Sequence, residues 1–177
     1  MIWVQGCPLR CSGCFNPDLW PFAPRNKIRT GDLADRITAV PDIEGVTFSG
    51  GEPFCQAAAL AEVGDLVRET GLNVVTFTGF PYQELRLRQR ASWNALLQVT
   101  DLLIAGPYRP DLPCSHPLRA SANQEVVNLS GQLIGREDEP GQAAGTVEYT
   151  ISPEGVITAT GFPDRHDSLC FMNTGGY

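Results

Sequence analysis

Short apolar runs and amphipathic stretches follow one another along residues 1–105 of the chain. Runs of apolar and β-branched residues predict strands at residues 2–4, 45–49, 72–78 and 101–105. Between them, apolar residues spaced three and four apart predict helices at residues 32–40, 56–70, 81–90 and 93–99. Because strands that alternate with helices favour a parallel sheet, the pattern predicts an α/β fold.

Residue types near the helix ends support these boundaries. Gly71 follows the helix predicted at residues 56–70, where a glycine ends a helix in the left-handed conformation. Thr30 and Ser92 precede predicted helices, and their hydroxyl groups are of the kind that caps a helix N-terminus.

The alternation changes in the C-terminal part of the chain. Residues 146–151 and 156–160 alternate apolar and polar side chains around the turn sequence Ser152-Pro153-Glu154-Gly155. This pattern predicts a β-hairpin. We therefore expect a core at residues 1–130 and a β-rich extension at residues 131–177 that packs on the same domain.

Composition and charge narrow the class of protein. The 177 residues and the hydrophobic fraction of 42% suit one domain, with Trp3 and Trp93 expected in its core. No apolar run approaches the roughly 20 residues of a membrane helix, and the chain's start lacks a basic leader, so we expect a cytoplasmic protein without a membrane partner. The net charge of −7 argues against a nucleic-acid partner. The cluster of Arg86, Arg88 and Arg90 is expected on a solvated helix face.

Three cysteines lie close together directly after the first predicted strand. Cys7, Cys11 and Cys14 are separated by three and then by two residues, in a loop whose glycines permit sharp bends. Iron–sulfur clusters are held by cysteine thiolates, and a four-iron cluster normally takes four of them. If no distant cysteine completes the set, one iron stays open to another ligand, and an open metal position is typical of catalysis.

A zinc site is the main alternative for this loop, with Cys55, Cys114 or Cys170 as the fourth ligand. Zinc sites usually show two pairs of closely spaced ligands, and this chain has no second pair. The three remaining cysteines are too scattered for an auxiliary cluster. Cys55 is instead expected to be a buried structural residue.

A second motif follows the strand predicted at residues 45–49. Ser49 leads into Gly50-Gly51-Glu52-Pro53, a turn whose glycines let the backbone approach a ligand closely. Ligand sites of α/β sheets lie at the carboxyl ends of the strands. A carboxylate and exposed carbonyl groups at this position are suited to accept hydrogen bonds from an ammonium group.

Together, the two motifs resemble those of the radical S-adenosylmethionine enzymes. That resemblance implies a [4Fe-4S] cluster on Cys7, Cys11 and Cys14, with S-adenosylmethionine bound to the open iron. It also implies reductive cleavage of this cofactor to methionine and a 5′-deoxyadenosyl radical, which removes a hydrogen atom from a substrate. The cofactor-binding residues implied by the resemblance are Gly13, Phe15, Asn16, Ser49, Gly50, Gly51, Glu52, Pro53 and Thr78. Phe15 stands beside the position before the third cysteine, where the family often has an aromatic residue and this chain has Gly13.

Within that superfamily, the chain is similar to the activating enzymes of glycyl radical enzymes, and especially to the anaerobic ribonucleoside-triphosphate reductase activating proteins. The resemblance covers about residues 1–130. It rests on the cysteine loop with Asn16 and Trp20, on residues 76–80 and 101–108, and on Arg119, Ser121, Asn123 and Gln124.

This resemblance implies a partial, incomplete parallel β/α barrel with the cluster at its C-terminal mouth, to which the predicted C-terminal β-hairpin extension is appended. It implies a glycyl radical enzyme as the macromolecular partner and a reduced flavodoxin or ferredoxin as the electron donor. The chain departs from the family at Ala105, where an acidic residue is usual, in the segment usually found upstream of Ile2, and in the hairpin-bearing extension after about residue 131. These departures keep two alternatives open: a radical enzyme that modifies a ribosomal peptide or small metabolite, and a non-catalytic zinc- or cluster-binding module.

Overall fold

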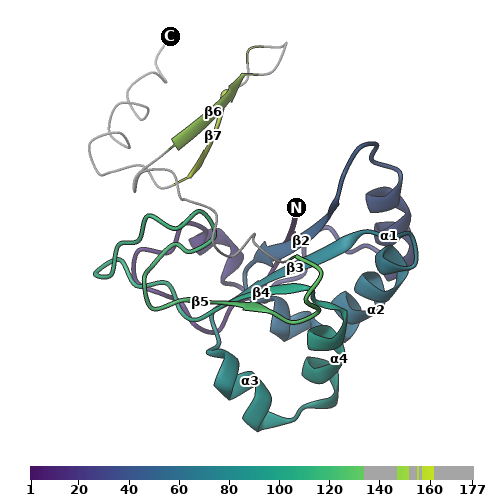
Figure 1. The fold of residues 1–177 in the computed structure, drawn as a ribbon. Helices are drawn as coiled ribbons and strands as arrows, with labels where there is room; N and C mark the ends of the chain where they lie inside the picture. Colours follow the sequence, from purple (N-terminus) through teal and green to yellow (C-terminus); the bar gives the residue numbers. More distant parts are fainter. Residues whose placement is uncertain (134–146, 152–154, 156, 162–177) are drawn as a thin grey trace.

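The computed structural model describes residues 1–133, 147–151, 155 and 157–161, and all structural statements below concern these residues (Figure 1). A five-stranded sheet forms its centre, in the order β1-β2-β3-β4-β5. The strands are β1 (Ile2–Val4), β2 (Gly45–Gly50), β3 (Asn73–Thr78), β4 (Leu102–Ala105) and β5 (Glu125–Asn128).

Strands β1 to β4 run parallel, as the alternation of elements predicted. Strand β5 was not predicted, and it pairs antiparallel with β4. Its residues follow a proline-rich loop and lack the alternation that marked the other strands. The sheet order ends at β1 on one side and β5 on the other, so these strands form an open sheet. Its curvature into a partial barrel stays a prediction.

Helices α1 (Thr30–Thr38), α2 (Ala57–Arg68) and α4 (Ala91–Val99) lie side by side against one face of the sheet (Figure 1). Alternate residues of the strands point to this face, because successive side chains of a strand point to opposite sides. Phe48, Val74 and Leu103 are buried there. At Gly64, helix α2 approaches α4 so closely that an added Cβ atom would lie 2.5 Å from a methyl group of Val99.

The four predicted helices are present, but the N-caps predicted at Thr30 and Ser92 were wrong. Helix α1 begins at Thr30 itself, after Arg29, and Ser92 lies within α4, whose N-cap is Arg90. Neither N-cap residue makes a side-chain capping hydrogen bond. Helix α3 (Tyr82–Arg88) ends at Gln89, which adopts the left-handed conformation with φ of 42°. Packing of the apolar helix faces therefore decided these boundaries rather than capping.

A partly buried ion pair joins the end of α2 to the start of β4, next to β3. Arg68 donates to Asp101 over 2.9 Å, and the second carboxylate oxygen of Asp101 accepts a hydrogen bond from the Val74 amide at 2.8 Å. Asp101 is 1% exposed, so both of its oxygens are satisfied within the protein.

Strands β6 (Val147–Ile151) and β7 (Ile157–Gly161) pair antiparallel, close to the ranges predicted from the alternation. The turn residues 152–154 lie outside the described residues, as does most of the predicted extension at residues 131–177. Its hairpin turn and its packing on the core therefore stay predictions. Among the described helices, none has the length and apolar character needed to cross a membrane.

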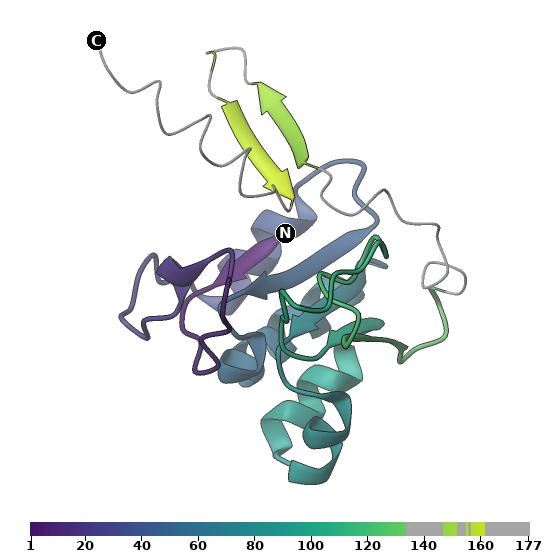
Figure 2. The ribbon, with the colours of Figure 1, turned by 90° about the vertical axis from the view of Figure 1, so that its left-hand side faces the viewer.

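The loops that carry the sequence motifs all follow the carboxyl ends of the parallel strands. The cysteine loop follows β1, the Gly-Gly-Glu-Pro turn follows β2, and the loop at residues 106–124 follows β4. In Figure 2, the cysteine loop lies on one side of this end of the sheet and the loop at residues 106–124 on the other. Parallel pairing thus brings segments from distant parts of the sequence to one edge.

Candidate cluster and cofactor site

The cysteine loop is closed by two backbone hydrogen bonds at its base. The Gly6 and Cys7 amides donate to the carbonyl oxygens of Leu19 and Trp20, at 2.8 and 3.0 Å. At the far side of the loop, the Cys14 amide donates to the Cys11 carbonyl at 3.2 Å. The loop is thereby an ordered turn in which the three cysteines have defined positions.

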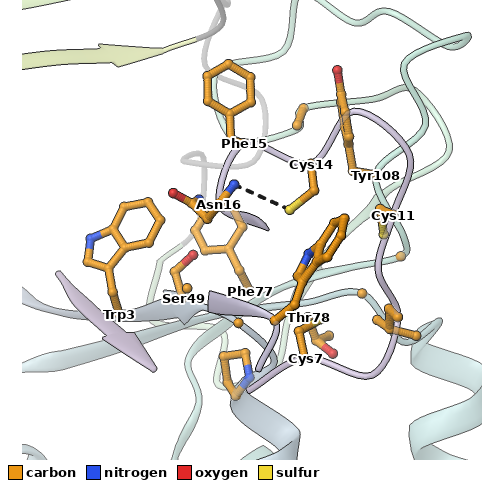
Figure 3. A pocket seen from close by; sticks show the side chains of 18 of the residues that line it. Trp3, Cys7, Cys11, Cys14, Phe15, Asn16, Ser49, Phe77, Thr78 and Tyr108 are labelled. Carbon is orange, nitrogen blue, oxygen red and sulfur yellow. Dashed lines mark hydrogen bonds between the residues drawn. The ribbon is translucent and has the colours of Figure 1, made fainter. Parts of the chain in front are cut away.

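The thiols of Cys7, Cys11 and Cys14 line one cavity of about 810 Å³ (Figure 3). The Asn16 amide donates a hydrogen bond to the Cys14 sulfur at 3.4 Å. Burial raises the pKa of the Cys7 thiol, while backbone amides of Leu9 and Arg10 that donate to its sulfur act in the opposite direction. Amides that point at cysteine sulfurs are a common feature of iron–sulfur sites.

No three His, Cys, Asp or Glu side chains in the described part of the chain converge closely enough to hold one metal ion. Convergence on one point is a requirement for a single metal ion, but it is not a requirement for a four-iron cluster. Each cysteine of a four-iron cluster binds a separate iron atom, whereas the four ligands of a zinc ion meet at one centre, about 2.0–2.3 Å from it. The cavity and its three thiols are therefore compatible with a cluster.

The Gly-Gly turn lies directly against the base of the cysteine loop. The Gly51 amide donates to the Val4 carbonyl at 2.7 Å, and the Glu52 amide donates to the Gly6 carbonyl at 2.8 Å. At Gly51, an added Cβ would overlap the Gly6 carbonyl oxygen and lie 2.8 Å from its carbon. Gly50 has φ of 99°, and a Cβ there would lie 2.5 Å from the Val4 amide nitrogen. Glycine is required at both positions because β1 and β2 approach so closely.

The Glu52 side chain points into the protein. It is 1% exposed and does not line the cavity. Its carboxylate accepts hydrogen bonds from the Phe54 amide, the Thr78 hydroxyl and the Gly79 amide, each at 2.9 Å. Burial raises the pKa of this carboxyl group to about 7, although the three hydrogen bonds act to lower it. In this structure the Glu52 carboxylate joins the ends of β2 and β3, and its role as a cofactor contact stays a prediction.

The other proposed cofactor residues fall into two groups. Phe15, Asn16, Ser49, Gly50, Gly51, Pro53 and Thr78 line the cavity together with the three cysteines. Gly13 does not line it. With φ of 70°, Gly13 instead shapes the turn before Cys14, and the nearest atoms to its Cβ position belong to Tyr108 and Pro110.

Sequence reasoning missed several lining residues. Trp3 was expected in the core, yet its side chain is 51% exposed and lines the cavity beside Ser49 and Phe77 (Figure 3). The signal was present in the alternation of β1, where Val4 is buried and Trp3 faces the other way. Tyr108 lines the cavity from the loop after β4. Its position at the cavity depends on the tertiary structure, and the local sequence pattern does not predict it.

Gln124 organises that loop. Its side-chain oxygen accepts hydrogen bonds from the amides of Ala120 and Ser121, at 2.8 and 3.2 Å. Its side-chain nitrogen donates to the Gly106 carbonyl at 3.0 Å. A single amide side chain thus joins both ends of the loop at residues 106–124, and the loop places Tyr108 at the cavity.

The side chain of Trp20 indicates whether the cavity is suited to a polar ligand. Its indole Nε1 is buried without a hydrogen-bond partner among the described residues, and the side chain lines the cavity. A buried donor without an acceptor costs about 1–3 kcal/mol. Sulfide, thiolate and carboxylate groups are all acceptors for an N–H donor. A cluster and an amino-acid cofactor therefore fit the chemistry of this lining.

The remaining cysteines are placed differently from expectation. Cys55 is exposed, so its interpretation as a buried structural residue was wrong. Cys114 is half-buried in the loop after β4, and neither thiol lines the cavity. Cys170 lies outside the described residues.

Comparison with known proteins also indicates an iron–sulfur cluster. A family described as "4Fe-4S single cluster domain" matches residues 1–127. Pyruvate formate-lyase-activating enzyme from Clostridium pasteurianum is 32% identical over 110 residues, which cover 59% of this chain and 43% of that protein. The enzyme of the same name from Listeria monocytogenes is 30% identical over 148 residues, 77% of this chain and 57% of that protein.

A third relative, the pyruvate formate-lyase-activating enzyme of Staphylococcus aureus strain USA300, is 26% identical over 139 residues, 75% of this chain and 55% of that protein. The chain spans about half the length of the curated relatives it matches. The matched family covers the cysteine loop, the glycine turn and all the parallel strands. The chain therefore belongs to the family of 4Fe-4S single cluster domains and is homologous to pyruvate formate-lyase-activating enzymes.

Proposed function

We propose that this protein is a cytoplasmic radical enzyme that cleaves S-adenosylmethionine reductively at a [4Fe-4S] cluster and so generates a glycyl radical on a partner enzyme. One observation carries the proposal. The thiols of Cys7, Cys11 and Cys14 and the Gly50-Gly51 turn line the same cavity. Three thiolates would bind three irons of the cluster there and leave the fourth without a cysteine ligand, open to the cofactor.

The cluster, when bound, supplies one electron that breaks a carbon–sulfur bond of the cofactor. The residues of the chain hold and orient the reactants. Gly50 and Gly51 let the turn pack on the backbone of Val4 and Gly6, because neither position has room for a side chain, and this contact holds the turn at the cavity. The buried Glu52 fixes this turn through its hydrogen bonds to Thr78 and Gly79.

Aromatic side chains offer a surface for the adenine part of the cofactor. Phe15, Phe77 and Trp3 line the cavity from the cysteine loop, β3 and β1 respectively (Figure 3). Flat aromatic rings stack on a nucleobase favourably, at about 1–3 kcal/mol per base. These rings also reduce the access of water to the reacting bond.

The edge of the cavity suits a macromolecular substrate. Met1, Trp3 and Phe15 line it and are 66%, 51% and 47% exposed. Exposed apolar residues grouped at the mouth of a cavity mark an interaction site. In the proposal, a glycine-bearing segment of the partner enters at this edge and loses a Cα hydrogen atom.

Anaerobic reconstitution with iron and sulfide tests the proposal. We expect a brown protein with about four irons per chain that releases 5′-deoxyadenosine after reduction with dithionite. A Cys11→Ala variant should lose that release by at least about 100-fold, because it removes a ligand of the reacting centre. Cys114→Ala is the matched control and should retain it, since Cys114 lies outside the cavity.

The outcome also separates the alternatives. A protein that holds one tightly bound zinc ion and releases no 5′-deoxyadenosine would be a binding module. A modified peptide or metabolite, in place of an electron paramagnetic resonance signal from a glycyl radical on the partner, would contradict the activase role and leave the cleavage chemistry standing.

A further inference from the structure

The loop at residues 106–124 meets the cysteine loop at Gly13. A Cβ atom at Gly13 would lie 3.6 Å from a ring atom of Tyr108. Figure 3 shows the Tyr108 ring next to Cys14 and Cys11. The two loops follow β1 and β4, the first and the fourth strands of the sheet order. Their contact therefore bridges the carboxyl ends of β2 and β3, which lie between them in the sheet.

Polar side chains of the same loop fix the backbone on both sides of Tyr108. The Asn123 side chain donates a hydrogen bond to the Pro107 carbonyl at 2.8 Å, directly before Tyr108. The Ser121 hydroxyl accepts a hydrogen bond from the Arg109 amide at 3.1 Å, directly after it. Because Ser121 is completely buried, water does not compete for its hydrogen bond.

Gln124 holds the backbone one residue further along. Its side chain donates to the Gly106 carbonyl, and the Gly106 amide donates in turn to the Thr78 carbonyl at 3.0 Å. We call the three side chains that hold the backbone around Tyr108 the loop clamp; they are Ser121, Asn123 and Gln124. A side chain whose backbone is held on both sides loses little further conformational entropy when it packs, so the position of the Tyr108 ring is pre-organised.

The three thiols of the cysteine loop differ in how far the protein covers them. Cys7 is buried at the base of the loop, whereas Cys11 and Cys14 are half-buried. Further cover for these two must come from another segment of the chain. Tyr108 is the aromatic residue that the loop after β4 contributes to the cavity lining, and it packs on the residue before Cys14.

We infer that Tyr108 is a positioning residue for the cluster: its ring, held by the loop clamp, packs on the turn before Cys14 and covers the Cys11 and Cys14 thiols. The inference rests on the proposed function, because these thiols are those of the cluster site. The reduction potential of a cluster depends on its exposure to solvent, and water stabilises the more negatively charged, reduced form. By excluding water, Tyr108 holds the reduction potential at a more strongly reducing value.

The first test uses the whole chain without a cluster. Alkylation of Cys11 and Cys14 by iodoacetamide is followed by mass spectrometry of protein purified without iron. Tyr108→Ala should raise the alkylation rate of both thiols about tenfold, because opening of the loop no longer breaks the packing of an aromatic ring. Tyr108→Phe keeps the ring and should stay within about twofold of wild type. Asn123→Ala removes one hydrogen bond of the loop clamp and should raise the rates about threefold.

The second test measures the reduction potential of the reconstituted cluster in a spectroscopic titration. Tyr108→Ala should shift the midpoint to a less negative value, by about 59 mV if the reduction equilibrium of this one-electron step changes tenfold. Tyr108→Phe should keep the wild-type potential, since the ring still excludes water. Tyr82→Ala is the matched control, the same substitution at a half-buried tyrosine of α3 outside the cavity, and it should change neither the alkylation rates nor the potential.

Equal alkylation rates and equal potentials in Tyr108→Ala and wild type would refute the role of Tyr108 and leave the proposed function standing. The same changes in Tyr82→Ala would reveal a general loss of stability and would overturn the inference. A Tyr108→Phe protein that behaves like Tyr108→Ala would assign the effect to the hydroxyl group and contradict cover by the ring. A wild-type protein that binds no cluster on reconstitution would refute the proposed function, and the role of Tyr108 with it.

Discussion

Replacing Gly51 by alanine should separate the two backbone segments that build the cofactor cavity. The added methyl group would overlap the Gly6 carbonyl oxygen, and ordinary contacts of such a carbon begin at 3.4 Å. The obstacle is backbone on both sides, so rotation of a side chain cannot relieve it. The turn after β2 must therefore move away from the cysteine loop by about 1 Å.

The magnitude follows from the hydrogen bonds at this contact. The bonds from the Gly51 amide to Val4 and from the Glu52 amide to Gly6 both span the gap that must open. Each is worth about 0.5–1.5 kcal/mol, and a buried amide left without an acceptor costs about 1–3 kcal/mol. We therefore expect Gly51→Ala to lower the free energy of unfolding by about 2–4 kcal/mol. Release of 5′-deoxyadenosine should fall about 100-fold, as expected for a displacement of about 1 Å at a reacting centre.

Anaerobic denaturant unfolding and the dithionite-driven assay measure both effects. Gly31→Ala is the control, because no atom lies within 4 Å of its Cβ position near the start of α1. Alanine there should raise stability by up to about 1 kcal/mol and leave the activity intact. A Gly51→Ala protein within 0.5 kcal/mol of wild type and fully active would show that the close approach of the two loops is not needed.

Three further predictions concern single sites. Trp20→Phe removes the buried indole donor, and the loss of one hydrogen bond should raise the dissociation constant for S-adenosylmethionine about five- to tenfold. Equilibrium binding to the reconstituted protein measures this constant. An unchanged constant would show that the indole does not donate to the bound cofactors. Burial raises the pKa of Glu52 to about 7 from 4.5, so its carboxyl group is protonated more readily in the folded than in the unfolded protein. As pH rises through 7 the buried carboxyl group of the folded protein loses its proton, and the buried charge lowers stability. The free energy of unfolding of wild type relative to Glu52→Gln should therefore fall by about 3 kcal/mol between pH 4.5 and 8. A difference that does not depend on pH would contradict this reasoning. Gly64→Ala should destabilise the protein by about 1–3 kcal/mol through its clash with Val99, and Val99→Ala should relieve that clash, so additive effects in the double variant would refute it.

Local sequence was enough to predict the helices and the four parallel strands, but not β5, and it was enough to find the two motifs of the candidate site. The spacing of Cys7, Cys11 and Cys14 and the Gly50-Gly51 pair are features of short segments, and no distant residue is needed to read them. The alternation of strands and helices likewise determined the parallel order of β1 to β4, because parallel neighbours require crossover connections. Where a local rule competed with packing, as for the caps expected at Thr30 and Ser92, packing prevailed.

Only the tertiary structure decided which side chains meet at the site. Glu52 points inward because Thr78 and Gly79, 26 and 27 residues away, supply donors to its carboxylate. Trp3 is exposed because it points to the face of the sheet opposite the one on which Val4 is buried against the core. A second cavity is lined by the loop after β1 together with the segments that follow β2 and β3, because parallel pairing brings these segments to one edge of the sheet. Such contacts join residues far apart in the chain, and a pattern read within one segment carries no information about its distant neighbours.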